Sequence, residues 1–146
     1  MKTSIKLIIT LVTFLSASHA IDAQQISMEN CSSSTTNRTI KLENSSENED
    51  ITIAIPKDLG CMHIAISSTI NSGYLTVEIY DPKGNKKGNF SIESQVKSSA
   101  SKSEMVCGQL QKQINDPIAG DWVVKLIPNN VSGDISINTL QMERKQ

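Results

Sequence analysis

The chain has 146 residues, a formal net charge of −1 and 3% aromatic residues. This length fits one ordinary domain, and the absence of a basic stripe excludes nucleic acid as an expected partner. Because aromatic rings are so few, the core must consist mainly of Ile, Val and Leu side chains, with Trp122 as its one large anchor.

The N-terminal residues have the pattern of a secretory signal peptide. Two lysines flank the start of an apolar stretch, 7–15, and Ser18 and Ala20 have the small-residue spacing that a signal peptidase reads. The apolar stretch is too short to span a bilayer as a stable helix, so we expect no transmembrane segment in the mature chain. We predict a signal peptide at 1–20, with cleavage after Ala20 or, as the second choice, after Ala23. The protein is then periplasmic, on the cell surface or secreted.

Residues 21–36 are polar and show no sustained period, which predicts a flexible N-terminal lead-in. From there onward apolar residues alternate with polar ones, as in half-buried β-strands. The clearest predicted strands are 51–55, 61–66, 74–80, 122–126 and 134–138, and the weaker ones are 38–42, 88–92 and 106–114.

Turn residues separate these strands, for example Asp81-Pro82-Lys83-Gly84-Asn85 and Asn115-Asp116-Pro117. Short strands that turn residues separate at regular intervals are typical of an all-β fold. We predict a single antiparallel β-sandwich, jelly-roll-like, of about eight strands. It would cover residues 37–140 and be followed by a C-terminal tail at 141–146.

Two longer stretches resemble known domains. Gly73 to Asn85, and Pro117 to Pro128 followed by Gly133 to Ile137, are similar to bacterial pre-peptidase C-terminal domains. More loosely they resemble the P domain of proprotein convertases and CUB-like sandwiches. In those families a strand ends in an Asp-Pro-x-Gly turn, and a later Pro-x-x-Gly-x-Trp motif opens another strand. The resemblance implies a jelly-roll-like sandwich with a non-catalytic accessory role. Such domains usually accompany a catalytic domain, and none is recognisable in this sequence.

The cysteines are Cys31, Cys61 and Cys107. In an oxidising compartment two of them could form a disulfide, and the odd number leaves one thiol over or paired with another chain. We predict Cys61–Cys107 as the bridge. The alternative is that all three are separate thiols that behave as small hydrophobic residues.

Oxygen-bearing side chains in the predicted turns form the candidate metal site, with calcium as the only candidate cofactor. If one end of the sandwich gathers them, its ligands would be Asp81, Asn85, Asp116, Asp121 and Asp134. The alternative is that these residues serve the geometry of their turns.

Tyr74 and Tyr80 share the outward side of one predicted strand and form the candidate ligand platform, because carbohydrate binding commonly uses exposed aromatic rings. They could equally be ordinary strand-favouring surface residues. His63 is the one histidine of the predicted mature chain, and it faces outward with no spaced catalytic partner, so we expect no enzymatic activity.

These observations predict a non-catalytic exported module that binds a protein or cell-envelope partner through its loops or an edge strand. The alternative is a carbohydrate- or calcium-binding accessory module of the same fold. A small secreted hydrolase is a distant third reading.

Overall fold

The computed structural model describes residues 32–95 and 104–144, so the predicted signal peptide and Cys31 lie outside the described residues. The described chain forms six strands: β1 (Ser33–Ser45), β2 (Glu49–Ile55), β3 (Leu59–Tyr80), β4 (Lys86–Ser94), β5 (Val106–Asn115) and β6 (Gly120–Glu143). They pair antiparallel in one sheet, which confirms the all-β antiparallel prediction. Across these two ranges no helix has the length and hydropathy needed to cross a bilayer.

The number of strands is six rather than about eight, because two pairs of predicted strands are continuous. The segments predicted at 61–66 and 74–80 are both part of β3, and those at 122–126 and 134–138 are both part of β6. Each long strand keeps its hydrogen-bonded ladder through a bend, with the register shifting there. The remaining four predicted strands correspond to β1, β2, β4 and β5.

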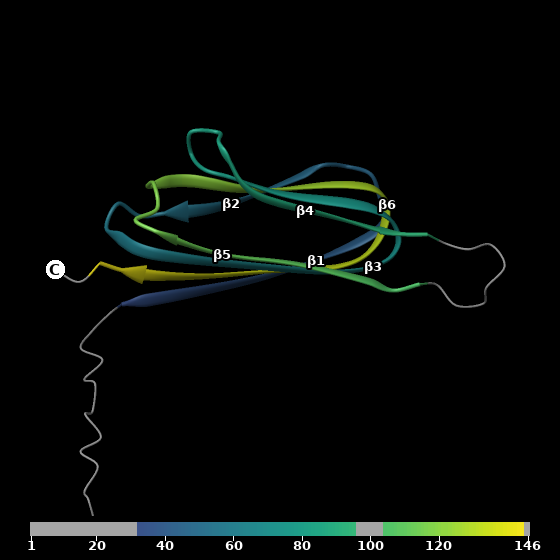
Figure 1. Cartoon of the computed structure of the whole chain (residues 1–146), viewed down its shortest axis with the longest axis horizontal. Helices are drawn as coiled ribbons and strands as arrows, with labels where there is room; N and C mark the ends of the chain where they lie inside the picture. Colours follow the sequence, from purple (N-terminus) through teal and green to yellow (C-terminus); the bar gives the residue numbers. More distant parts are fainter. Residues whose placement is uncertain (1–31, 96–103, 145–146) are drawn as a thin grey trace, which may run out of the picture.

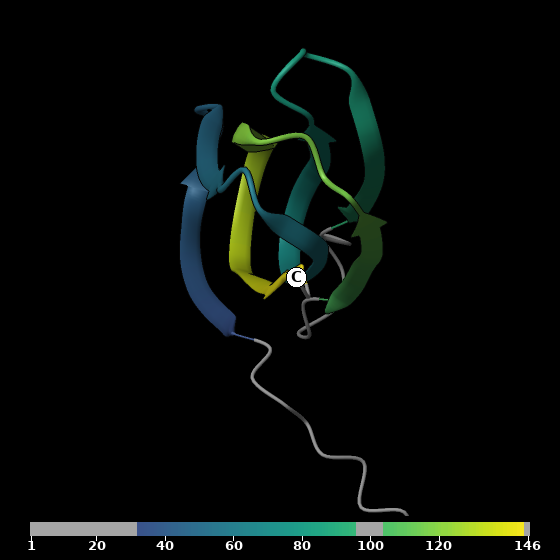
Figure 2. The same cartoon turned by 90° about the vertical axis from the view of Figure 1, so that its left-hand side faces the viewer.

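The two long strands run through both halves of the molecule, so the sheet folds back on itself in two layers (Figure 1). In what we call the lower layer, β1 pairs with the second half of β6, which pairs with the first half of β3, which pairs with β5. In the upper layer, β2 pairs with the first half of β6, which pairs with the second half of β3, which pairs with β4. Figure 2 views these layers from one end.

The bend between the layers is built from residues with a positive φ angle. Gly73 of β3 has φ 81°, and Asn130 of β6 has φ 52°. A Cβ atom on Gly73 would lie 2.3 Å from the carbonyl oxygen of Asn130, so the two strands cross too closely there for a side chain. The hydroxyl of Ser46 makes two hydrogen bonds with Asn130 at this crossing. It donates to Asn130 Oδ1 at 3.2 Å and accepts from the Asn130 backbone N–H at 2.9 Å.

The core lies between the layers and is almost wholly aliphatic around one indole. Trp122 is only 1% exposed, and its Nε1–H donates to the carbonyl oxygen of Ile118 at 2.8 Å. The fully buried side chains around it come from the inward sides of β3 and β6: Met62, Ile64, Ile66, Ile70, Leu75, Val77, Ile79, Val124, Leu126, Val131 and Ile135.

Both ends of the domain extend further than the sequence indicated. β1 begins at Ser33 and therefore includes the end of the predicted lead-in 21–36, because Ser33 pairs with Met142. For the same reason β6 continues to Glu143, into the predicted tail 141–146.

Candidate functional site

Asp81, the first predicted calcium ligand, organises the hairpin between β3 and β4. Its Oδ1 accepts the backbone N–H groups of Lys83 at 2.9 Å and Asn85 at 2.8 Å. Its Oδ2 accepts the Asn85 side-chain amide at 3.0 Å and pairs with the Lys87 ammonium at 3.0 Å. Burial of the carboxyl acts to raise its pKa, but these hydrogen bonds outweigh burial and hold the pKa well below its usual range. Asp81 and Asn85 are thus brought together as hydrogen-bond acceptor and donor. They serve the geometry of the turn, which was the alternative to calcium binding.

The other predicted metal ligands are dispersed. Asp121 lies beside the hairpin, in a shallow hollow that it shares with Asp81. Asp116 follows β5 and pairs with Arg144. Asp134 is in the lower layer, opposite Lys41 of β1. Within the described ranges, no three His, Cys, Asp or Glu side chains are grouped to hold a metal ion, so the five residues do not form the single site that the turns suggested.

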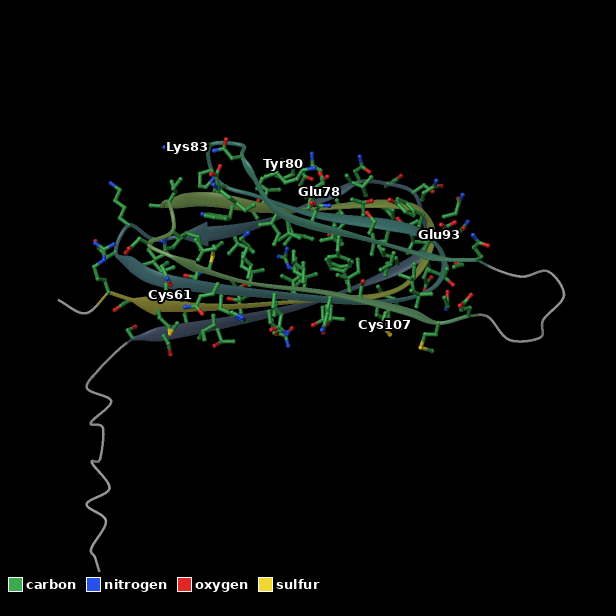
Figure 3. The ribbon with its side chains drawn as sticks, in the orientation of Figure 1. Cys61, Glu78, Tyr80, Lys83, Glu93 and Cys107 are labelled. Atoms are coloured by element: carbon green, nitrogen blue, oxygen red, sulfur yellow. The ribbon has the colours of Figure 1, made fainter. Side chains whose placement is uncertain are left out.

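Tyr80 is part of a network of charges on the outer side of the upper layer (Figure 3). Its hydroxyl donates to Glu78 Oε2 at 2.6 Å, and this bond raises the pKa of Tyr80. The ammonium groups of Lys86 and Lys125 lie 5.8 Å and 6.0 Å from the centre of its ring. The ring already has cations as neighbours, so it is not a free surface for stacking on a sugar.

Tyr74 is 42% exposed and stands apart from Tyr80. The two tyrosines are six residues apart along β3, which is roughly 20 Å at the usual rise per residue. Hydrogen bonds with Ser91 and Thr76 lower the pKa of Tyr74. The two rings therefore do not make the common platform that their shared side of the strand suggested.

The predicted Cys61–Cys107 disulfide is wrong, and both residues are free thiols. In the register of β3 with β5, Cys61 is opposite Asn115 and Cys107 is opposite Thr69. The thiols are therefore roughly 26 Å apart along the strands, whereas a disulfide needs Cα atoms within about 7 Å. Figure 3 shows Cys61 and Cys107 toward opposite ends of the lower layer.

The central part of the outer side of the lower layer, which we call the neutral face, is a surface of mainly amides and hydroxyls that the sequence did not reveal. The next row toward the bend is charged, because it contains Lys41 and Asp134. The side chains of the neutral face alternate with the buried ones of the same strands and are half-buried or exposed. Across β1, β6, β3 and β5 its three central rows are Thr35–Leu140–His63–Gln113, Asn37–Asn138–Ala65–Gln111 and Thr39–Ser136–Ser67–Gln109. Apart from His63, no residue of these rows carries an ionisable side chain.

A hollow of about 250 Å³ lies in the neutral face around the short side chain of Ala65. Ala65 has Asn138 as its register neighbour on one side and Gln111 on the other. The remaining lining includes Ser67 and Gln109. The hollow thus has a methyl group at its centre and side-chain amides around it, which supply both donors and acceptors.

The outer side of the upper layer has the opposite character. Lys125 lies between Asp50 of β2 and Glu78 of β3 in the register, and its ammonium is 3.9 Å from the Asp50 carboxylate. Lys86 pairs with Glu78, and this bond lowers the pKa of Glu78. The outer side of the upper layer therefore carries paired charges over its centre, whereas the three rows of the neutral face carry no charge pair, and the Lys41–Glu43 pair of the lower layer lies beyond them.

The neutral face was missed because it has no motif. The one local signal is the segment of β5 in which Gln109, Gln111 and Gln113 alternate with larger inward residues. That alternation predicts a strand with an amide-rich outer side, but the three other strands that complete the face are far away in the sequence.

No protein-family model and no curated protein sequence matches the chain. Among solved structures it is similar to a subunit of disulfide-linked pili, the Bacillus endospore appendages, with 9% identity, a TM-score of 0.37, and coverage of 80% of this chain and 92% of that chain. It is also similar to a carbohydrate-binding module of Cellvibrio mixtus lichenase 5A, solved with cellotriose, with 13% identity, a TM-score of 0.35, and coverage of 81% and 92%. Both scores are low, so neither likeness supports an argument about this chain. The resemblance to pre-peptidase C-terminal and CUB-like domains stays a prediction.

Proposed function

We propose that the chain is an exported, non-catalytic β-sandwich module that binds an uncharged glycan of the cell envelope with its neutral face. The observation that carries this proposal is the set of amide and hydroxyl rows around the hollow at Ala65. Export rests on the signal-peptide pattern of residues 1–20.

The strand pairing supports a jelly-roll for this module. When β3 and β6 are each divided at their bends, the chain consists of eight consecutive segments. The first pairs with the last, the second with the seventh, the third with the sixth, and the fourth with the fifth. This nested pairing is what a long hairpin wound into two layers would produce, and it is a scaffold that many binding proteins share.

The chemistry of the neutral face favours an uncharged, hydroxyl-rich ligand. Each amide side chain offers both donors and an acceptor, which matches the hydroxyl groups of a sugar. Uncharged polar groups also cost less to remove from water than charged ones. A ligand bound on the charged upper face would instead have to displace the ion pairs of Glu78 and Asp50.

The proposal includes neither a catalytic step nor calcium. In the register, His63 has Leu140 and Gln113 as its neighbours, and neither side chain can relay a proton for an imidazole. Both carboxylate oxygens of Asp81 already accept hydrogen bonds or an ion pair from the hairpin.

An array of neutral and acidic glycans, followed by an NMR titration with the best ligand, tests the proposal. We expect neutral glycans to bind, with a Kd that changes little with salt because no charges pair. Replacing Gln109, Gln111 or Asn138 with Ala should weaken binding about 2- to 12-fold each, the equivalent of one lost hydrogen bond.

The matched control is Thr76→Ala with Ser91→Ala, which removes a hydroxyl pair from the upper face and should leave the Kd unchanged. The proposal fails if only acidic glycans bind with a steep salt dependence. It also fails if the ligand shifts the NMR signals of the upper face and leaves the neutral face unaffected.

A further inference from the structure

A mainly apolar pocket lies at one end of the molecule, between the start of β4, the end of β5 and the turn that leads into β6. Figure 2 looks at this end of the molecule. The volume of the pocket is about 300 Å³, and Ile114, Pro117, Ile118 and Trp122 contribute its apolar lining.

Lys112, which also lines the pocket, is a charged residue on the inward side of β5. The side chains two positions before and after it, Leu110 and Ile114, pack against the core, and Lys112 is half-buried like them. Its ammonium donates a hydrogen bond to the backbone carbonyl oxygen of Lys87 in β4. An ammonium has three N–H donors, so this bond leaves two of them for another acceptor.

The other charged side chains that line the pocket are already paired. The Lys87 ammonium lies 3.0 Å from the carboxylate of Asp81, and Asp116 pairs with Arg144. Lys112 makes no ion pair with any residue of 32–95 or 104–144. The lining of the pocket therefore has one positive charge that no described carboxylate neutralises.

We propose that this pocket binds a small carboxylic acid with an apolar tail, such as a short-chain fatty acid. The tail lies against Ile114, Ile118 and Trp122, and the carboxylate accepts the remaining N–H groups of Lys112. Apolar walls with one polar anchor are the usual composition of a small-molecule site, and a volume of about 300 Å³ is at the lower end of the range for such sites. That volume favours a small free acid over a lipid with two chains.

The acid site does not depend on glycan binding. Lys112 belongs to the inward side of β5, whereas Gln109 and Gln111, which the glycan experiment replaces, belong to the outward side and do not line this pocket. Failure of either proposal therefore leaves the other one standing.

Titration with octanoate, with octanamide as its uncharged analogue, tests the inference through the fluorescence of Trp122, the one tryptophan of the chain. We expect a saturable change and a Kd about 5- to 10-fold lower for octanoate than for octanamide, a difference that shrinks at high salt. Each methylene removed from the tail should raise the Kd about fourfold.

Lys112→Met keeps an apolar side chain of similar length and removes the charge. It should raise the Kd for octanoate about 5- to 10-fold and leave the Kd for octanamide unchanged, which also shows that the pocket is intact. The matched control is Lys83→Met, which removes the same charge from an exposed side chain of the nearby hairpin and should change neither Kd. Ile118→Ser should weaken both ligands about 4- to 10-fold, because it removes part of the apolar wall.

Three results would overturn the inference. One is equal affinity of the unmodified protein for octanoate and octanamide, because Lys112 then contributes no anchor. Another is an equal loss of octanoate affinity in Lys83→Met and Lys112→Met, since net charge would then attract the acid. The third is a fluorescence change that does not saturate with octanoate.

Discussion

The geometry of the bend that joins the two layers predicts how much Gly73→Ala lowers the free energy of unfolding. Gly73 has φ 81° and Gly84, in the β3–β4 hairpin, has φ 79°, so alanine meets the same backbone strain at both positions, about 1–2 kcal/mol. The two sites differ in space. A Cβ on Gly73 would lie 2.3 Å and 2.5 Å from the carbonyl oxygens of Asn130 and Asn129, whereas a Cβ on Gly84 has no neighbour within 4 Å.

Relieving that overlap requires the two long strands to move apart by about 1 Å, a distortion comparable with overpacking, which costs about 1–3 kcal/mol. Gly73→Ala should therefore lower the free energy of unfolding by about 2–5 kcal/mol, and Gly84→Ala by about 1–2 kcal/mol. Urea titrations followed by the fluorescence of Trp122 measure both values. If Gly73→Ala is no more destabilising than Gly84→Ala, the close crossing of β3 and β6 does not restrict position 73 to glycine.

Three further predictions concern the core, the hairpin and the thiols. Trp122→Phe should lower the free energy of unfolding by about 2 kcal/mol, because it removes part of the buried ring and the bond to Ile118, and circular dichroism during urea titration measures this. Asp81→Asn should destabilise the protein at pH 7, and the difference from the unmodified protein should shrink as the pH falls below the ordinary aspartate pKa of about 3.9. The reason is that a carboxyl whose pKa is lowered by folding stabilises the protein above the unfolded-state pKa and loses that effect toward its folded-state pKa. A constant difference from pH 7 to pH 2 would contradict this assignment. Cys107 is exposed and should react with a thiol reagent faster than the half-buried Cys61, and replacing both with Ser should leave the melting temperature equally unaffected with and without reductant.

Alternation of apolar and polar residues was enough to place the strands along the chain. Every segment with a period of two is a strand in the structure, and the inward register of Trp122 follows from the same pattern. The hairpin after β3 was also predictable, because Asp81 and Gly84 are turn residues whose role depends only on local backbone geometry.

Pairings between distant residues were not predictable in the same way. The positions of Cys61 and Cys107 depend on the register of β3 with β5, and nothing local to either cysteine sets that register. The neutral face could not be predicted for the same reason. Asn37, Ala65, Gln111 and Asn138 form one row only because four strands lie side by side.

The continuity of β3 and β6 follows from a change of phase in the alternation. In β3 the buried side chains lie at even positions from Met62 to Ile70 and at odd positions from Leu75. Without an inserted residue Tyr74 would point into the core, because a slip of one residue turns every side chain of a strand to the other face. The register shifts around Ser72, next to the positive φ of Gly73, insert that residue as a bulge.

The same change of phase occurs in β6, where Pro128 and Val131 are buried on either side of the positive φ of Asn130. A break in phase with turn residues beside it resembles the end of one strand and the start of the next, which is why each long strand was predicted as two. A bulge with a left-handed residue differs from a loop in one physical respect, since its flanking residues stay paired with the neighbouring strand. Because β3 and β6 are each other's neighbours and bend at the same place, each supplies the partner that keeps the other continuous.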